Sequence, residues 1–365
     1  MQTADNSGPG TAPTPDAIDA RWLRETLNHA GKDIRPTGVT VAPVGTGQLA
    51  ETYRLVLSYD EAGHGGPSSM ICKLAASDEN SRATAKHWSL YEREVRFYQN
   101  LASTARIDTP ALFAGDMSPD GRFFLLLEDL APASVGDQFR GMEAADARKA
   151  MQEIAKLHAA TWGDGDRPGL EWLETGRLAQ PFYAPEVFRS LWPQFRERYK
   201  DRLSNEQIGV CDGFAEKYDS YSRPLARPRC VTHNDFRPDN MLYGAPGNDR
   251  LSVVDWQSAG LGFNAVDVAY MIGGAFEPEK RRAQEADLLA HYHDELIHQG
   301  ISGYTLADVQ QDYRHFAFAG INVSVCAAVL VKRTERGDRM FLTMLDRHVR
   351  HVIDADSIAL LDDIG

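Results

Sequence analysis

The sequence predicts an α+β fold of two lobes, in which a small β-rich lobe precedes a larger, mostly helical one. The chain of 365 residues exceeds the usual size of a single domain. Strand-like segments fill the part before residue 130, whereas long helical patterns dominate from Glu143 onward. A hydrophobic fraction of 43% and a charged fraction of 25% are ordinary for a globular protein. We therefore expect a disordered tail over residues 1–16, an N-terminal lobe over 17–130 and a C-terminal lobe over 131–365.

The expected elements of the first lobe follow in order. Residues 1–16 are rich in Pro, Gly, Ser and acids and lack the basic start and apolar core of a signal peptide. An amphipathic helix is expected over residues 17–30, before the breaks at Gly31 and Pro36. The remaining expectations are two strands within 38–60, a third within 68–76, one helix over 86–102 and a hairpin within 109–132.

The second lobe is expected to be helical except around residues 230–256. Helical patterns cover residues 143–162, 277–298, 306–332 and 339–360. The longest apolar run, residues 323–331, is about half of the ~20 residues that a membrane span requires, so we expect a buried helix there. The lobe boundary is expected between Leu130 and Gly136.

Charge and cysteine usage exclude several classes of protein. A formal net charge of −13 and a pI near 5.3 disfavour binding to nucleic acid or to an anionic membrane, and we expect neither as a partner. The four cysteines are scattered and form no CxxC pair, so neither a zinc site nor a disulfide framework is indicated. A reducing cytoplasm fits this usage best.

The stretch THNDFRPDNMLYG, residues 232–244, gathers acids, amides, a histidine and an arginine at the mouth of a predicted hairpin. The strands of that hairpin would be residues 240–243 and 251–254. In a symmetric hairpin Asn240 lies opposite Asp255, and an amide beside a carboxylate suits Mg²⁺. Asp235 precedes Asn240 by five residues, which is the spacing between the catalytic base and a metal-binding Asn in the kinase catalytic loop.

The alternative is a surface loop whose Asp and Asn side chains cap turns. For His233 and Asp235 alone that interpretation would be better. Asn240 and Asp255 reverse the balance, because Asp255 closes an apolar strand, where a buried acid needs a metal or several donors.

With these motifs the chain resembles the aminoglycoside phosphotransferase and choline kinase superfamily of small-molecule kinases, which have a bilobal protein-kinase-like fold. The ecdysteroid-kinase-like branch and its bacterial relatives look most similar, and the resemblance runs from about Val39 to the C-terminus. It implies ATP and Mg²⁺ as cofactors and a small-molecule hydroxyl group as acceptor. Asp235 would be the catalytic base, and Asn240 and Asp255 would bind the metal.

The resemblance also assigns a lysine and a glutamate to the first lobe. Lys73, in the apolar strand MICKLAA, would contact the ATP phosphates. Its partner would be a helix glutamate, either Glu92 or Glu94. We choose Glu94, because it shares a stripe with Leu90 and Phe97, whereas Glu92 does not.

Two further segments of the first lobe would bind the nucleotide by the same resemblance. Gly45 and Gly47 would form the turn that covers the phosphates, and ordinary hairpin glycines are an equally good interpretation of these two residues alone. Backbone groups near Glu128 and Leu130 would bind adenine at the hinge, where a plain linker would look similar.

Several residues depart from the family pattern or support it without reacting. Asn234 stands where Gly is usual, Asp239 where Gly is common, and Gln257 where Glu is frequent. We expect Asp267 to brace the catalytic loop or cap a helix. His158 is expected to be packed in the core, and His233 to brace the loop.

Two rival functions remain to be weighed, and the chemical class of the acceptor is open. A protein kinase is disfavoured, because only 11 residues separate Asp255 from Asp267 and leave no room for an activation segment. A nucleotide-binding pseudokinase or scaffold is the alternative.

An amino-sugar or amino-alcohol acceptor would need an acidic pocket. A steroid or hydroxyacyl acceptor would need an apolar pocket, for which the candidates are Trp192, Phe195, Tyr199, Phe316, Phe318 and Met344. For each of these residues a position in the core is the better interpretation.

A phosphorylated acceptor or an acyl-CoA would need a basic cluster. Lys332, Arg333 and Arg336 form the obvious candidate, and the charged end of a helix is the other interpretation. The oligomeric state is not readable from the sequence.

Overall fold

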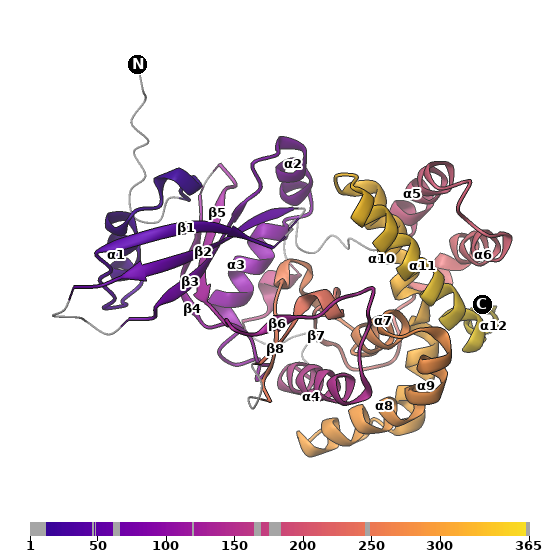
Figure 1. The fold of residues 1–365 in the computed structure, drawn as a ribbon. Helices are drawn as coiled ribbons and strands as arrows, with labels where there is room; N and C mark the ends of the chain where they lie inside the picture. The colour runs from indigo at the N-terminus through magenta and orange to yellow at the C-terminus, as the bar shows by residue number, and fades with distance from the viewer. Residues whose placement is uncertain are drawn as a thin grey trace. The chain divides into compact units, whose positions relative to one another are not determined.

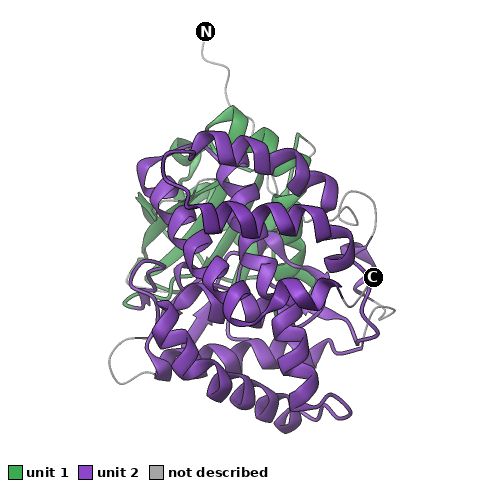
Figure 2. Cartoon of the chain, turned by 90° about the vertical axis from the view of Figure 1, so that its right-hand side faces the viewer, with its two compact units in different colours: residues 1–103, 109–132 green, residues 104–108, 133–365 purple. Residues whose placement is uncertain are grey.

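The computed structural model describes residues 12–45, 47, 49–60, 66–118, 120–163, 169–174, 184–244 and 249–362. The chain divides into two compact units, coloured separately in Figure 2. Unit 1 comprises Met1–Ser103 and Thr109–Pro132, and unit 2 comprises Thr104–Asp108 and Ala133–Gly365. Residues 104–108 thus depart from the expected lobe 17–130. They join unit 2 because Asp108 bonds to Arg250 through its carboxylate (2.7 Å) and to Val253 N–H through its carbonyl (2.8 Å).

Unit 1 is built on one antiparallel sheet in the strand order β1-β2-β3-β5-β4 (Figure 1). The helix expected over residues 86–102 is two helices, because Ser89 takes a left-handed backbone conformation (φ 55°) between them. The elements are η1 (Pro15–Ala17), α1 (Ala20–His29), β1 (Gly38–Val44), β2 (Ala50–Ser58), β3 (Ser69–Ala75), α2 (Glu79–His87), α3 (Leu90–Asn100), β4 (Leu112–Met117) and β5 (Phe123–Glu128).

The expected tail over residues 1–16 lies mostly outside the described residues, which begin at Ala12. Ala12 is buried and its N–H donates to Ser118 Oγ (3.1 Å). The 3-10 turn η1 follows, and Asp19 then caps α1 by accepting from Trp22 N–H (2.7 Å).

Helices cover both faces of the sheet in unit 1. Trp22 of α1 meets Phe124 of β5 edge to face at 5.4 Å, whereas Tyr91 of α3 stacks on Phe123 at 4.4 Å. Neighbouring strand residues point to opposite faces, so these contacts fix one face for α1 and the other for α3. Lys73 of β3 pairs in register with Leu125, which is on the Phe123 face, and therefore points toward α3.

Unit 2 is mostly helical, with two small antiparallel sheets in the orders β6-β8-β9 and β10-β7. Its first elements are β6 (Ser134–Val135), α4 (Ala144–Ala160), η2 (Glu171–Leu173), α5 (Pro185–Arg198), α6 (Asn205–Tyr221), β7 (Cys230–Thr232), η4 (Pro238–Asn240), β8 (Met241–Tyr243), β9 (Leu251–Val253), η5 (Trp256–Ser258) and β10 (Gly260–Gly262). The C-terminal elements are α7 (Ala265–Ala275), α8 (Pro278–His298), α9 (Leu306–His315), η6 (Phe316–Phe318), α10 (Ala319–Leu330), α11 (Glu335–Asp354) and α12 (Ser357–Asp362).

The C-terminal helices are more broken than the sequence predicted. The 3-10 turn η6 divides the expected helix 306–332 into α9 and α10. The last helix begins earlier than expected, because the Thr334 side chain caps α11 by accepting from Gly337 N–H (3.0 Å). It ends earlier as well, and Asp356 turns the chain with a φ of 50° before α12.

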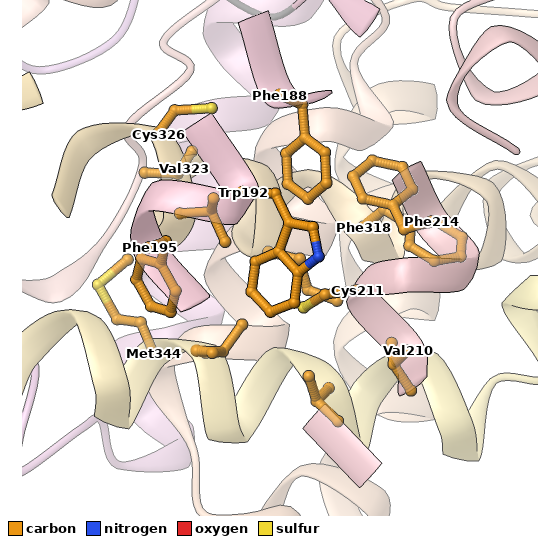
Figure 3. Packing of buried hydrophobic residues seen from close by; sticks show 14 of the residues in the cluster. Phe188, Trp192, Phe195, Val210, Cys211, Phe214, Phe318, Val323, Cys326 and Met344 are labelled. Atoms are coloured by element: carbon orange, nitrogen blue, oxygen red, sulfur yellow. The ribbon is translucent and has the colours of Figure 1, made fainter. Parts of the chain in front are cut away.

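The aromatic residues considered for an apolar acceptor pocket belong to the core of unit 2. Trp192, Phe195, Phe318 and Met344 pack together there with side chains from α5, α6 and α10 (Figure 3). Trp192 exposes 4% of its surface and Phe195 none. The interpretation that these side chains are core residues is therefore confirmed.

One helical stretch in the described part of the chain, Leu306–Leu330, is long and apolar enough by composition to cross a membrane. Its most apolar window is 78% buried inside the protein. The C-terminal half of the stretch is α10, which packs against α5 and α11. The predicted buried helix within residues 323–331 is thus confirmed as part of the core.

Two buried histidines on α11, His348 and His351, lie against glycines of the neighbouring helices. None of their four ring nitrogens has a hydrogen-bond partner among the described residues. A Cβ added to Gly320 of α10 would lie 2.0 Å from His348 Nε2, and one on Gly273 of α7 would lie 2.5 Å from His351 Nδ1. The imidazole rings therefore occupy space that only glycine leaves free.

This histidine pair predicts a loss of stability in acid. Burial, reinforced by the Arg347 and Arg281 guanidinium groups, lowers the pKa of His348 to about 3, and the pKa of His351 is also lowered by burial. Below about pH 6.5 the unfolded chain protonates both histidines while the folded chain keeps them neutral. The free energy of unfolding should therefore fall as pH drops from 6.5, by up to about 1.4 kcal/mol per pH unit for each histidine.

Urea unfolding at pH 8, 6 and 5 measures this dependence. His348→Asn should be less stable than the parent at pH 8 but should lose less stability between pH 8 and 5. His298→Asn, at the exposed end of α8, is the matched control and should keep the parent's slope. A His348→Asn variant with the parent's slope would contradict the prediction.

Candidate active site

A buried carboxylate fixes the start of the loop that carries Asp235. Asp267, in the first turn of α7, accepts the backbone N–H groups of His233 and Asn234, both at 2.7 Å. His158 Nε2 lies 3.2 Å from the same carboxylate, and Tyr292 O–H lies 2.7 Å from the other ring nitrogen of His158. The predictions that Asp267 braces the loop and that His158 is packed in the core are confirmed by these contacts.

Asn234 has a backbone role that explains its departure from the family pattern. Its φ is 62°, in the left-handed region that glycine adopts freely and Asn tolerates better than most residues. Its side-chain Nδ2 donates to Ser258 O (2.9 Å), which ties the loop to the turn after Asp255. Asn234 therefore keeps the conformation that a glycine would have there.

His233 connects the loop to the neighbouring hairpin. Its Nδ1 accepts from Asp235 N–H (3.2 Å), so its Nε2 carries the ring proton and donates to Val254 O (3.0 Å). The ring also packs against Trp256 at 4.6 Å. The brace role predicted for His233 is confirmed, because it holds Asp235 and the residue before Asp255 at once.

Three donors converge on the Asp235 carboxylate. Its Oδ1 accepts from Arg237 Nε (3.0 Å) and from Tyr270 O–H (2.9 Å), and its Oδ2 accepts from Asn240 Nδ2 (2.7 Å). The Asp235 side chain is 18% exposed. It is thus fixed in orientation by both oxygens and still reaches the surface of unit 2.

Arg237 is a charged neighbour of this carboxylate under all ordinary conditions. Burial alone would lower the pKa of Arg237, but Asp235, Tyr270 and Asp239 outweigh burial and raise it. Its Nη1 donates to Asp239 Oδ2 (2.7 Å), and Asp239 Oδ1 accepts from Gln138 N–H (2.8 Å). Asp239 therefore anchors Arg237 to the segment that precedes α4.

The hairpin that carries the two predicted metal ligands has a different register from the one expected. Its strands pair Met241 with Val253, and Val254 N–H donates to Asn240 O (3.0 Å). The residue opposite Asn240 is thus Val254, and the expectation that Asp255 lies directly across from it is wrong by one position. Asp255 comes next, in a left-handed conformation with φ 68°, so the strand has already turned when it reaches the acid.

The side-chain oxygen atoms of Asn240 and Asp255 are suited to binding a hard cation. Both hydrogens of Asn240 Nδ2 are used on Asp235, on its backbone O (2.8 Å) and on its Oδ2. The amide oxygen of Asn240 has no hydrogen-bond partner in the described residues and is left for another ligand. Asp255 Oδ2 accepts a 3.3 Å bond from Gln257 Nε2. An amide oxygen and a carboxylate are the ligand types that Mg²⁺ prefers.

The predicted nucleotide residues belong to unit 1, where Lys73 pairs with Glu94. Lys73 Nζ lies 2.8 Å from Glu94 Oε1 and 2.7 Å from Oε2, and the two side chains are 13% and 2% exposed. Glu92 instead pairs with Arg96 at 2.8 Å on the exposed face of α3. The buried face of α3 therefore includes Glu94 and not Glu92, as we predicted from the sequence.

The other nucleotide candidates lie on the turn after β1 and at the end of β5. Gly45 has a φ of 77°, and a Cβ on Gly47 would lie 2.4 Å from Ala50 O, so both positions favour glycine. Glu128 N–H donates to Ala111 O (2.8 Å), and the Glu128 carboxylate accepts from Ala111 N–H (3.1 Å). Leu130 follows, partly buried, two residues before the last residue of unit 1.

Sequence reasoning missed Tyr270, which holds Asp235 from α7. The residue stands in the apolar run NAVDVAYMI and shows no motif of its own. A signal was nevertheless present, because Tyr270 follows Asp267 by three residues and thus lies on the same helix face. Because Asp267 faces the loop, Tyr270, which is the next polar residue on the same face of the helix, faces the loop as well.

These arrangements have a definite chemical capacity. In unit 2, one carboxylate is held by three donors, and an amide oxygen and a second acid follow on the adjoining hairpin. In unit 1, a lysine largely shielded from solvent forms an ion pair with a buried glutamate. A carboxylate held in this way can accept a proton from a hydroxyl group, and a lysine of this kind can bind phosphate.

Comparisons with known proteins agree with this capacity. The chain is 23% identical over 321 residues to the N-acetylmuramate/N-acetylglucosamine kinase of Pseudomonas putida, covering 84% of this chain and 83% of that protein. The Plasmodium vivax ethanolamine kinase structure aligns with a TM-score of 0.57 and 11% identity over 90% of this chain and 88% of that one. The structure of a microcompartment-associated aminopropanol kinase aligns with a TM-score of 0.54 and 14% identity, over 93% of this chain and 99% of that one.

The structural likeness confirms the predicted bilobal, protein-kinase-like α+β fold. The closer resemblance to ecdysteroid-kinase-like proteins stays a prediction. The model of the Phosphotransferase enzyme family matches residues 40–304, which is most of the chain. The chain therefore belongs to the phosphotransferase enzyme family.

Proposed function

We propose that this enzyme is a Mg²⁺- and ATP-dependent small-molecule kinase that transfers the γ-phosphate of ATP to an acceptor hydroxyl group. The observation that carries the proposal is the Asp235 carboxylate, held by Arg237, Tyr270 and Asn240 at the surface of unit 2. The relatives named above act on ethanolamine, aminopropanol and amino sugars, which supports a small hydroxyl compound as acceptor.

In the proposed reaction Asp235 orients the acceptor hydroxyl and accepts its proton as the oxygen attacks the γ-phosphorus. The new O–P bond forms while the bond from the γ-phosphorus to the bridging oxygen breaks, and ADP leaves with that electron pair. Lys73 neutralises phosphate charge, and Asn240 and Asp255 would hold the metal ion. Bound Mg²⁺ would offset the negative charge of the phosphates. Most of the rate gain would come from positioning and electrostatics.

The direct test is ADP formation from ATP with a panel of acceptors. The panel contains amino alcohols, amino sugars, N-acetyl sugars, hydroxy acids and hydroxysteroids, each assayed with Mg²⁺ and with the metal removed by chelation. Acceptor-dependent and metal-dependent ADP formation is expected. ATP binding without turnover of any acceptor would favour the alternative, a nucleotide-binding pseudokinase or scaffold.

The four buried free cysteines support a reducing cytoplasm as the place of the activity.

A matched pair of variants tests the nucleotide residues of unit 1. Glu94→Gln should lower kcat/KM for ATP by about tenfold or more, because the largely shielded Lys73 loses the charge of Glu94 and its defined position. Glu92→Gln removes the same charge two residues away on the exposed face of α3 and should change kcat/KM little. Steady-state kinetics at varied ATP measures both. Equal effects from the two substitutions would contradict the assignment of Glu94.

A further inference from the structure

Unit 2 contains an arginine-lined cavity at the beginning of α11. The cavity measures about 410 Å³ and is lined by Arg202, Arg333, Thr334, Glu335, Asp338 and Arg339. A second cavity of about 270 Å³ is also lined by Arg202 and Arg339, so these two arginines stand where both hollows meet. The larger volume is in the range of sites for small molecules.

The charges around the cavity leave two guanidinium groups available. Asp338 is already satisfied, because it accepts from Tyr199 O–H (2.7 Å) and from Arg333 Nε (2.8 Å). Arg339 lies over the Phe139 ring at 4.3 Å, which positions it without neutralising it. Neither Arg339 nor Arg202 forms an ion pair with any described residue. Both arginines are exposed, and three arginines against the two acids Glu335 and Asp338 give the cavity a net positive lining. In a chain with 52 acidic residues against 39 basic ones, such a lining favours an anionic ligand.

Two residues of α11 beside the cavity-lining Arg339 contact the loop that carries Asp235. Arg336 Nη2 lies 3.9 Å from Asp239 Oδ2, and Arg237 Nη1 lies 3.6 Å from Met340 Sδ. Arg336 and Met340 are on α11 on either side of Arg339 and about 6 Å apart along the helix axis. A ligand bound to Arg339 would therefore lie within a few ångströms of Arg336 and Met340, which contact the loop. A small acceptor can span such a distance.

We propose that Arg202 and Arg339 bind an anionic group of the acceptor, a carboxylate or a phosphate, while its hydroxyl group meets Asp235. This inference rests on the proposed kinase function and narrows its substrate class to hydroxyl compounds with a negative charge. A guanidinium fork binds either group in the same bidentate way. The competing interpretation is a solvated helix end, in which case Arg202 and Arg339 would contribute nothing to binding.

Matched acceptors separate these interpretations. Small hydroxy acids are assayed against their methyl esters, and sugar phosphates against their unphosphorylated sugars, so the two arms distinguish carboxylate from phosphate. Arg202→Gln and Arg339→Gln should each raise KM for the charged member by roughly tenfold or more and leave KM for ATP unchanged. Arg350→Gln is the control, because Arg350 lies further along α11 in an exposed ion pair with Glu206 (2.7 Å).

Binding measured without turnover keeps the inference separate from the proposed function. Calorimetry with Asp235→Asn protein compares the same charged compounds before and after adding both arginine substitutions. Tighter binding of a charged compound than of its neutral partner, lost in the double arginine variant, supports the subsite even if no acceptor turns over. Equal binding of the charged and neutral members, or binding retained without both arginines, would overturn it even if the kinase activity is established.

Discussion

Replacing Asp235 with Asn should lower kcat by roughly 10²–10⁴-fold, the usual contribution of a positioned general base. The amide has no basic oxygen of comparable strength, and its NH₂ group would oppose either Asn240 Nδ2 or the two donors from Arg237 and Tyr270. Nucleotide affinity should stay near that of the parent, because the proposed phosphate contacts belong to Lys73. Single-turnover phosphotransfer gives the rate, and calorimetric titration with ATP gives the affinity.

Asp239→Asn is the matched control for this substitution. It removes a carboxylate from the same loop and from the same arginine, but Asp239 contacts Gln138 N–H and Arg237 and not Asp235. We expect it to cost at most about tenfold in kcat, through a looser Arg237. A parent-like rate in Asp235→Asn, or an equal loss in both variants, would show that Asp235 is not the base.

Local sequence patterns were sufficient to predict the elements with a single strong signal. The burial stripe of residues 90–101 distinguished Glu94 from Glu92, because side chains three and four apart share a helix face. The brace role of Asp267 was one of two roles expected for it beside the family resemblance, the other being a helix cap. The choice of Glu94 needed only contacts between neighbours in the sequence, whereas Asp267 contacts a loop more than 30 residues away.

Features set by backbone conformation and tertiary packing could not be predicted in this way. Left-handed residues at Ser89 and Asp255 divide a helix and redirect a strand, and neither residue is the glycine that would have indicated a turn. The register of the short hairpin could not be fixed by three paired residues on each strand. For the aromatic residues of α5 the sequence favoured the core over a pocket, and their packing against α6 and α10 confirms the core.

The backbone of the loop that carries Asp235 is thus held by neutral and anionic groups, and the Asp235 carboxylate is held in part by one arginine. Asp267 holds its backbone, His233 ties it to Val254, and Asn234 supplies the left-handed turn between them. Asp239, which departs from the family pattern, pairs with Arg237 and with Arg336 and so connects the base to α11. Asp239 is thus linked through Arg336 to α11, the helix that also carries Arg339.

Asp267→Asn should lower the free energy of unfolding by about 2–5 kcal/mol and also lower kcat in the protein that remains folded. The buried carboxylate accepts two backbone N–H groups, and an amide leaves one of them facing an NH₂ group without an acceptor. Displacing His233 and Asn234 would then move Asp235 away from its donors. Urea unfolding measures the first effect, and kcat measured well below the unfolding temperature gives the second.

Asp354→Asn separates these two effects, because it also removes a carboxylate from a buried partner in unit 2. Asp354 pairs with Arg281, whose side chain is 1% exposed, and it contacts no residue of the Asp235 loop. We expect Asp354→Asn to lose stability while its folded fraction keeps the parent's kcat. If Asp267→Asn behaved in the same way, the bonds from Asp267 would stabilise the fold without positioning the base.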